Sequence, residues 1–164
     1  MKTLPHHLSQ HAATGLTLNE PVSQYEIGNY QNFVYLITDW KNKVAAIIDP
    51  QKNLDHLLED LKKNDLKLVE IFLTHTHHDH IAGVPELLEL FPSLHVTVHE
   101  HDQHRLNSRI APPNRIKNIH EGDTLRVGEI EVRVFHTPGH SSGECSYYIA
   151  PPVGPYIYRR YGFH

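Results

Sequence analysis

The sequence is short of cysteine, of excess positive charge and of long apolar runs, and each shortage excludes a class of protein. Its only cysteine, Cys145, allows no disulfide within the chain and gives no reason to place the protein outside the cell. Lys and Arg number 15 against 19 Asp and Glu, so the net charge is −4 and we expect no nucleic-acid partner. No apolar run approaches the ~20 residues of a membrane span, and the N-terminus resembles no signal or transit peptide. We therefore expect a cytoplasmic protein with no membrane span.

The composition is that of one folded domain. The chain has 164 residues, of which 39% are hydrophobic and 21% are charged, which is enough for a core and argues against disorder. Residues 1–20 are polar and show no hydrophobic period, so we expect a flexible N-terminal arm there. We expect residues 21–150 to form the domain and residues 151–164 to be an atypical tail. The 16 histidines are unusual and raise the question of a metal.

Hydrophobic periodicity predicts alternating strands and helices. Leucines at helical spacing predict a helix over residues 54–64, with Asn53 as its N-cap. A second helix is expected over residues 81–91, with Pro85 in its first turn. This alternation indicates an α/β domain built in layers. The apolar runs predict strands near residues 22–27, 33–37, 43–49, 68–73, 94–98, 130–135 and 145–149.

The densest group of candidate metal ligands lies between an apolar strand and the second helix. It reads Thr74-His75-Thr76-His77-His78-Asp79-His80. A strand end carries its loop to the rim of a sheet, where binding sites are usually built. His75 and His77 are two positions apart, so they project from the same side of an extended loop, and Asp79 and His80 come at the following turn. Imidazole and carboxylate ligands suit a borderline cation such as zinc.

A second turn supplies another imidazole. The segment Thr137-Pro138-Gly139-His140-Ser141-Ser142-Gly143 follows the strand near residues 130–135. Its proline and glycine favour a tight turn that presents His140 at a strand end. Three histidines and a water molecule form a catalytic zinc ligand set. The two motifs together therefore predict a metal site that contains His75, His77 and His140.

The two motifs resemble those of the metallo-β-lactamase superfamily, and most closely its glyoxalase II branch, the hydroxyacylglutathione hydrolases. The likeness extends from about Tyr25 to Ile149. It includes the segment Ile47-Ile48-Asp49-Pro50, the loop at 74–83 and the turns at 121–123 and 137–143. The resemblance implies an αββα sandwich with a metal site at one edge, here with an incomplete second half.

The resemblance also implies roles for the motif residues. By motif position, His75, His77 and His140 bind a first metal, and Asp79 and His80 bind a second. The implied cofactor is one or two zinc ions, with iron as the alternative. The implied reaction is cleavage of a thioester such as S-acylglutathione by a zinc-bound hydroxide, with Asp79 as the catalytic residue that helps to orient the nucleophile. The implied partner is therefore a small-molecule acyl thioester.

The C-terminal tail departs from the family pattern. In the family, a later strand ends in Gly-Asp-x-(Leu/Phe)-Phe, whose aspartate bridges both metals, but this chain has no aspartate after Asp123. Shifted by one base, codons for residues 159–163 can encode Gly-Asp-Thr-Val-Phe. One hypothesis is that a frameshift near residues 155–158 truncated a longer hydrolase. The alternative is a naturally short paralogue, and the nucleotide sequence of the gene decides between the two.

A shortened chain would hold its second metal weakly and leave a sheet edge uncovered. We therefore expect impaired activity, and self-association through that edge. Two other functions stay open, namely an iron-dependent persulfide dioxygenase and a non-catalytic metal-binding remnant of the fold. His78 falls at a variable motif position and is not counted as a ligand, and His136 is expected to be an ordinary strand residue. The remaining histidines of the domain are expected at surface or rim positions: His95, His99, His101, His104 and His120.

Overall fold

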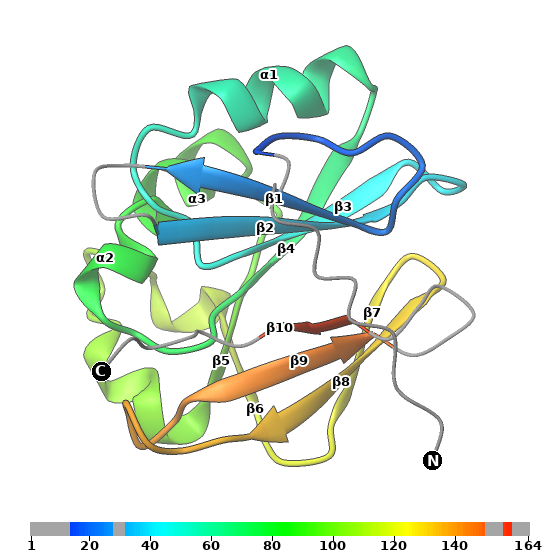
Figure 1. Ribbon diagram of the computed structural model, residues 1–164. Helices are drawn as coiled ribbons and strands as arrows, with labels where there is room; N and C mark the ends of the chain where they lie inside the picture. Colours follow the sequence, from blue (N-terminus) through cyan, green and yellow to red (C-terminus); the bar gives the residue numbers. More distant parts are fainter. Residues whose placement is uncertain (1–13, 28–31, 150–155, 159–164) are drawn as a thin grey trace, which may run out of the picture.

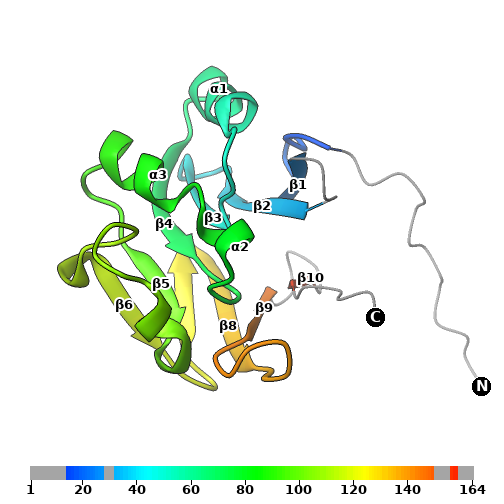
Figure 2. The same cartoon turned by 90° about the vertical axis from the view of Figure 1, so that its left-hand side faces the viewer.

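Two β-sheets pack face to face, and α-helices cover the outer face of the first sheet (Figures 1 and 2). The computed structural model describes residues 14–27, 32–149 and 156–158, the last three by their backbone alone. In these residues no helix has the length and apolar character that crossing a membrane requires. The three layers are, in order, the helices, the first sheet and the second sheet.

The first sheet has six strands and changes from antiparallel to parallel pairing along its width. β1 to β3 are antiparallel neighbours, whereas β3 to β6 pair in parallel. Parallel neighbours need crossover connections, and these connections carry the helices. Across the sheet the strands are β1 (Val22–Ile27), β2 (Asn32–Asp39), β3 (Val44–Ile48), β4 (Lys67–Phe72), β5 (Val96–His99) and β6 (Ile116–Ile119).

The second sheet is antiparallel and has four strands in the order β10-β9-β8-β7. Its strands are β7 (Thr124–Val127), β8 (Ile130–His136), β9 (Cys145–Ile149) and β10 (Tyr156–Tyr158). Within residues 14–27, 32–149 and 156–158, the helices all precede this sheet in the chain. They are α1 (Asp55–Lys63), α2 (His78–Ile81), α3 (Val84–Leu90) and the 3₁₀-helices η1 (Glu100–Arg105) and η2 (Pro113–Arg115).

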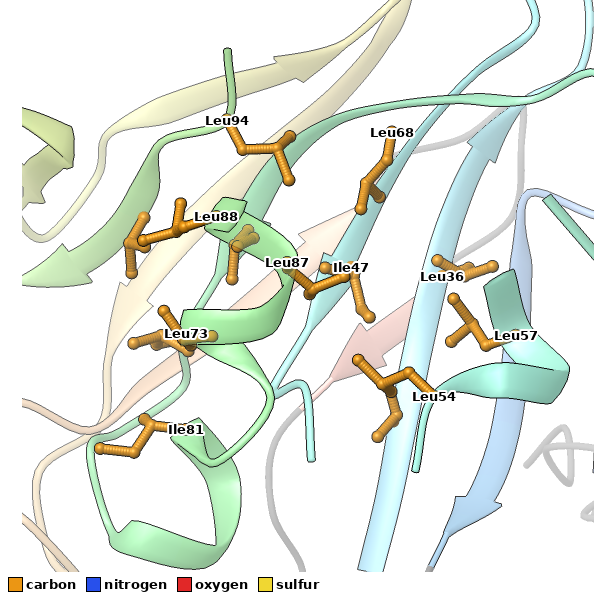
Figure 3. Close-up of a cluster of buried hydrophobic side chains, with 14 of the residues drawn as sticks. Leu36, Ile47, Leu54, Leu57, Leu68, Leu73, Ile81, Leu87, Leu88 and Leu94 are labelled. Carbon is orange, nitrogen blue, oxygen red and sulfur yellow. The ribbon is translucent and has the colours of Figure 1, made fainter. Parts of the chain in front are cut away.

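Strand β3 is buried on both faces because it lies between the helices and the second sheet. Successive side chains of a strand point to opposite faces. Ala45 and Ile47 accordingly join the cluster under the helices, and Ala46 and Ile48 join the cluster between the sheets. Figure 3 shows leucines of the α1 segment close to Ile47. An unbroken apolar run in the sequence therefore corresponds to a strand with two buried faces.

The expected α/β fold of metallo-β-lactamase type is confirmed, with two differences at the helices. The helix expected over 81–91 is α3, which starts only at Val84, and a separate short helix, α2, precedes it over His78–Ile81. Gly83 separates them, because its N–H donates to Pro50 O at 2.9 Å and a Cβ there would lie 2.2 Å from Gln51 O. The expectation of Asn53 as N-cap of the first helix is wrong, since Asn53 has a φ of 64° and Leu54 is the N-cap.

Both expected end segments lie partly outside the described residues. Residues 1–13 of the expected arm are not described, but its last residues contact the first sheet: Gly15 N donates to Gln24 O at 2.7 Å, and Trp40 Nε1 donates to Glu20 O at 2.7 Å. Of the expected tail, the structure describes only the backbone of β10, which pairs with β9.

Candidate metal centre

The first motif sits at the end of β4, where the chain leaves the sheet. Leu73 N still donates to Thr97 O of β5 at 2.9 Å, and His77, just before α2, has an extended backbone. The ring centroids of His75 and His77 are 4.9 Å apart, so their side chains lie on the same side of this segment. Asp79 and His80 come on the single helical turn of α2, which starts directly afterwards.

The second motif is the turn between β8 and β9. Thr137 N donates to Glu144 O at 2.8 Å and closes the turn, and His140 N donates to Glu144 Oε2 at 3.1 Å. Cys145 N, the first residue of β9, donates to Thr74 O at 2.8 Å. This backbone bond joins the second sheet to the residue just before His75, so it brings the two motifs side by side.

The three histidines predicted to share an ion come together in space. One ring nitrogen from each of His75, His77 and His140 lies within 4.8 Å of the other two. The ring centroids are 4.9 Å apart for His75 and His77, 5.1 Å for His75 and His140, and 4.3 Å for His77 and His140. His75 is buried, His77 is half-buried and His140 is exposed, so the group is open to solvent on one side.

The predicted second pair, Asp79 and His80, lies next to this group. The rings of His75 and His80 are 4.3 Å apart, and His80 Nε2 is 3.4 Å from Asp79 Oδ2. His80 is 4% exposed, and within the described part of the chain neither of its ring nitrogens makes a hydrogen bond. A buried imidazole without a hydrogen bond is costly unless something else binds it. The donor set at His80 therefore fits a metal ion.

Asp49 is a member of the site that the sequence analysis left without a role. It forms a second candidate ligand group with His75 and His80, and its Oδ2 lies 3.4 Å from His80 Nδ1. Its carboxylate also accepts hydrogen bonds from Thr74 N at 2.7 Å and from Thr74 Oγ1 at 2.5 Å. In the sequence it is an aspartate between a buried strand and Pro50, a position that by itself indicates only a strand end.

The chain Asp49–Thr74–His75 fixes the orientation of one imidazole. Thr74 has a single hydroxyl proton, which goes to the Asp49 carboxylate, so Thr74 Oγ1 accepts from His75 Nδ1 at 2.9 Å. The lone pair of His75 is then on Nε2. Partners of this kind hold metal-binding histidines in the correct tautomer.

Asp102 ties the two motif loops together and was also missed. Its carboxylate accepts from Thr76 N at 3.3 Å in the first loop, and from Ser141 Oγ at 2.8 Å and Gly143 N at 2.9 Å in the second. Burial raises the pKa of Asp102, but these hydrogen bonds outweigh burial and keep it below the ordinary value. No local signal marks it, because it lies in a polar run and its partners are distant in the sequence.

The other histidines follow the expectation with one exception. His101, His104 and His120 are exposed, and His95 is half-buried. His99 is 3% exposed, so the expected surface or rim position is wrong for it. It ends β5, whose side chains are all buried.

Comparison with known proteins agrees with the fold. A family model described as the metallo-beta-lactamase superfamily matches residues 27–151. A solved structure described as the BLEG-1 B3 metallo-beta-lactamase matches with a TM-score of 0.66 and 31% identity, over 78% of this chain and 66% of that one. The structure of TTHA1623 in a di-iron-bound form matches with a TM-score of 0.62 and 28% identity, over 76% of this chain and 65% of that one.

Among curated proteins, the hydroxyacylglutathione hydrolase of Gloeobacter violaceus is 37% identical over 119 residues, which are 73% of this chain and 44% of that protein. This chain spans 44–46% of the length of the hydroxyacylglutathione hydrolases that it matches. The resemblance read from the two histidine motifs is confirmed, and the chain belongs to the metallo-β-lactamase superfamily.

Proposed function

We propose that this chain belongs to a metal-dependent hydrolase of the glyoxalase II type, which cleaves thioesters such as S-acylglutathione. The observation that carries the proposal is the convergence of His75, His77 and His140 from two distant loops. The identity to proteins named hydroxyacylglutathione hydrolase supports a thioester as the substrate.

We infer a divalent metal, zinc in the first instance, as the cofactor. His75, His77 and His140 would hold a first ion, and Asp79 and His80 would hold a second. Asp49 lies near enough to His80 to belong to that second group. A divalent ion supplies an activated water nucleophile near neutral pH and stabilises negative charge that develops on the substrate.

Side chains of this protein would hold the metal-binding histidines in place and accept a proton during the reaction. Asp79 is exposed at the edge of the site, and its Oδ2 accepts from Asn32 Nδ2 at 3.2 Å. A carboxylate in this place can orient an attacking water molecule and accept its proton. Asp49 and Thr74 keep the His75 ring in one tautomer, and Asp102 keeps the loop of His140 against the first motif.

A thiol nucleophile is a poor alternative for this site. Cys145 lies close by in the sequence and is fully buried. Burial, with a smaller contribution from Asp102, raises the pKa of the Cys145 thiol to about 12. The thiolate is the reactive form, so this cysteine is inert near neutral pH.

The test compares the wild-type chain with His77→Ala and a matched control, His78→Ala. His78 is the exposed neighbour that the motif leaves out. We expect wild type and His78→Ala to carry at least one equivalent of metal by elemental analysis and to hydrolyse an S-acylglutathione. We expect His77→Ala to lose the hydrolysis and one equivalent of metal, and the circular dichroism spectrum should show that it still folds.

Three outcomes would contradict the proposal. Equal metal content in His77→Ala and wild type would show that the histidine group does not hold the ion. Bound metal without hydrolysis of any acyl thioester would favour a non-catalytic metal-binding protein. Bound iron with oxygen uptake and no hydrolysis would favour a dioxygenase.

A further inference from the structure

A second group of histidines lies outside the candidate metal centre and shares no residue with it. His99 ends β5 in the first sheet, His101 is in η1, and His136 ends β8 in the second sheet. One ring nitrogen from each lies within 4.8 Å of the other two. The rings of His99 and His136 are stacked, with centroids 4.0 Å apart and an angle of 12° between their planes. We propose that His99, His101 and His136 form a further binding site for a divalent transition-metal ion, separate from the candidate metal centre.

The site is built into the framework of the fold. His99 is 3% exposed, because it is the last residue of a fully buried strand. His136 is half-buried and His101 is exposed, so the group has one solvated side by which an ion can enter. The ligands come from both sheets, so a bound ion would link the sheets at this edge.

The hydrogen bond of His136 leaves a nitrogen free for a metal. His136 Nε2 lies 2.8 Å from Ser142 O, and a carbonyl oxygen can only accept, so Nε2 carries the proton. The lone pair is therefore on Nδ1. A ligating histidine usually donates its other N–H to a carbonyl or carboxylate in this way.

His99 already makes a hydrogen bond that would compete with a metal ion. Its Nδ1 accepts a hydrogen bond from His101 N at 3.2 Å. A metal either takes Nδ1 in place of this amide, or takes Nε2 after the proton has moved to Nδ1. The lone pairs of the stacked His99 and His136 rings lie in nearly parallel planes, so one ring must turn before both can bind one ion. The loss is therefore one long hydrogen bond and this stacking contact, set against the metal–nitrogen bonds.

The charges around the group favour a cation. Glu100 lies beside it, with carboxylate oxygens 3.8 Å from His101 Nε2 and 3.4 Å from His120 Nε2. The carboxylate of Glu121 accepts a hydrogen bond from His136 N.

The occupant is a borderline divalent ion, for which we name Zn²⁺ and Ni²⁺ as the probes. Three imidazoles suit these ions and are poor ligands for Mg²⁺ or Ca²⁺. The proposal is independent of the hydrolase function, because it needs neither the first histidine group nor any substrate.

The test measures Zn²⁺ and Ni²⁺ binding by equilibrium dialysis and elemental analysis. The variants are His101→Ala and His104→Ala. Both residues are exposed and lie on η1, but His104 is outside the group, so it reports the weak binding common to surface histidines. We expect His101→Ala to bind one equivalent less than wild type, or to bind that equivalent roughly 10-fold more weakly. His104→Ala should match wild type.

A second background separates this site from the candidate metal centre. In a His77→Ala/His140→Ala chain that keeps the circular dichroism spectrum of the wild type, about one equivalent should still bind, and adding His101→Ala should remove it. If that double variant does not fold, the difference between His101→Ala and His104→Ala in the wild-type background decides alone. Identical stoichiometry and affinity for His101→Ala and His104→Ala would overturn the proposal, whatever the thioesterase assay shows.

Discussion

Gly143 is the residue at which the second motif closely approaches Asp102 of η1. Its N–H donates to Asp102 Oδ1 at 2.9 Å, and a Cβ added to it would lie 2.7 Å from Asp102 N and 2.8 Å from Asp102 Cβ. Backbone atoms cannot move away from such a contact without shifting η1. This position therefore needs glycine because of the close approach.

We accordingly expect Gly143→Ala to destabilise the fold by about 1–3 kcal/mol, as overpacking in a buried contact does. Gly139→Ala is the matched control in the same turn, because its Cβ would meet only Glu144 Oε2 at 4.0 Å. Urea unfolding of both variants measures the difference. Equal stabilities would show that the turn tolerates displacement from Asp102.

The candidate ligands were predictable at the scale of single residues, but their supports were not. His75, His77 and His140 stand in short motifs, and the spacing of the first two already placed them on one side of an extended loop. Asp49 binds Thr74, which is 25 positions away in the chain. Asp102 binds Thr76 and Ser141, which are 26 and 39 positions away. No local pattern encodes such pairs, because they exist only after the strands have assembled.

At the scale of elements, Tyr147 of β9 joins the second sheet to the end of β4. Its hydroxyl donates to Leu73 O at 2.7 Å, and its ring stacks on Phe72 with centroids 5.3 Å apart. Burial raises the pKa of Tyr147, so the hydroxyl stays protonated and remains a donor.

Tyr147→Phe keeps the ring and removes this hydrogen bond, so we expect a loss of about 1–2 kcal/mol in the free energy of unfolding. Tyr148→Phe is the control, because Tyr148 lies on the other face of the same strand and is half-buried. Chemical denaturation measures both. A Tyr147→Phe chain as stable as wild type would show that Leu73 O finds another donor.

A second link between the sheets depends on pH. Asp39 ends β2, and its carboxylate accepts from Glu129 N at 2.7 Å, in the turn between β7 and β8, and from Asn42 Nδ2 at 2.7 Å. Burial raises the pKa of Asp39, but the hydrogen bonds from Glu129 and Asn42 lower it below the ordinary value. Its contribution to stability is therefore present above the ordinary carboxyl pKa and is lost as the pH falls through the lowered one.

We expect Asp39→Asn to be less stable than wild type at pH 7, and the difference to shrink as the pH drops below about 4. Thermal unfolding from pH 7 to pH 3 measures it, with Glu89→Gln on the exposed side of α3 as the control. A difference that stays constant over this range would assign the effect to packing.

Element types were predictable where the apolar pattern was clear, as in the unbroken apolar run that forms strand β3. The break between α2 and α3 was not predictable, because it depends on a distant backbone segment: Gly83 N donates to Pro50 O, and a Cβ on Gly83 would collide with Gln51 O. The helical spacing of apolar residues continues through Gly83, so this spacing does not mark the break.

At the scale of the whole molecule, metal binding and stability are linked. An ion that binds only the folded chain stabilises it, by about 2.7 kcal/mol at a free concentration 100 times the Kd. We therefore expect Zn²⁺ to raise the melting temperature, and a chelator to lower it to the value of the metal-free chain.

Mg²⁺ at the same concentration is the control, because histidine ligands do not favour it. The shift in melting temperature should be smaller in His77→Ala than in wild type. An unchanged melting temperature with Zn²⁺ would contradict a specific site anywhere in the fold.

The pairing of Tyr147 with Leu73 also has a consequence for the order of folding. The two residues are 74 positions apart, and the candidate ligands His75 and His140 flank this contact. Contacts between distant segments form late, because a long stretch of chain must first be ordered. We therefore expect the candidate ligand group to assemble only late in folding, so that a cation would stabilise the folded chain and would not start its folding.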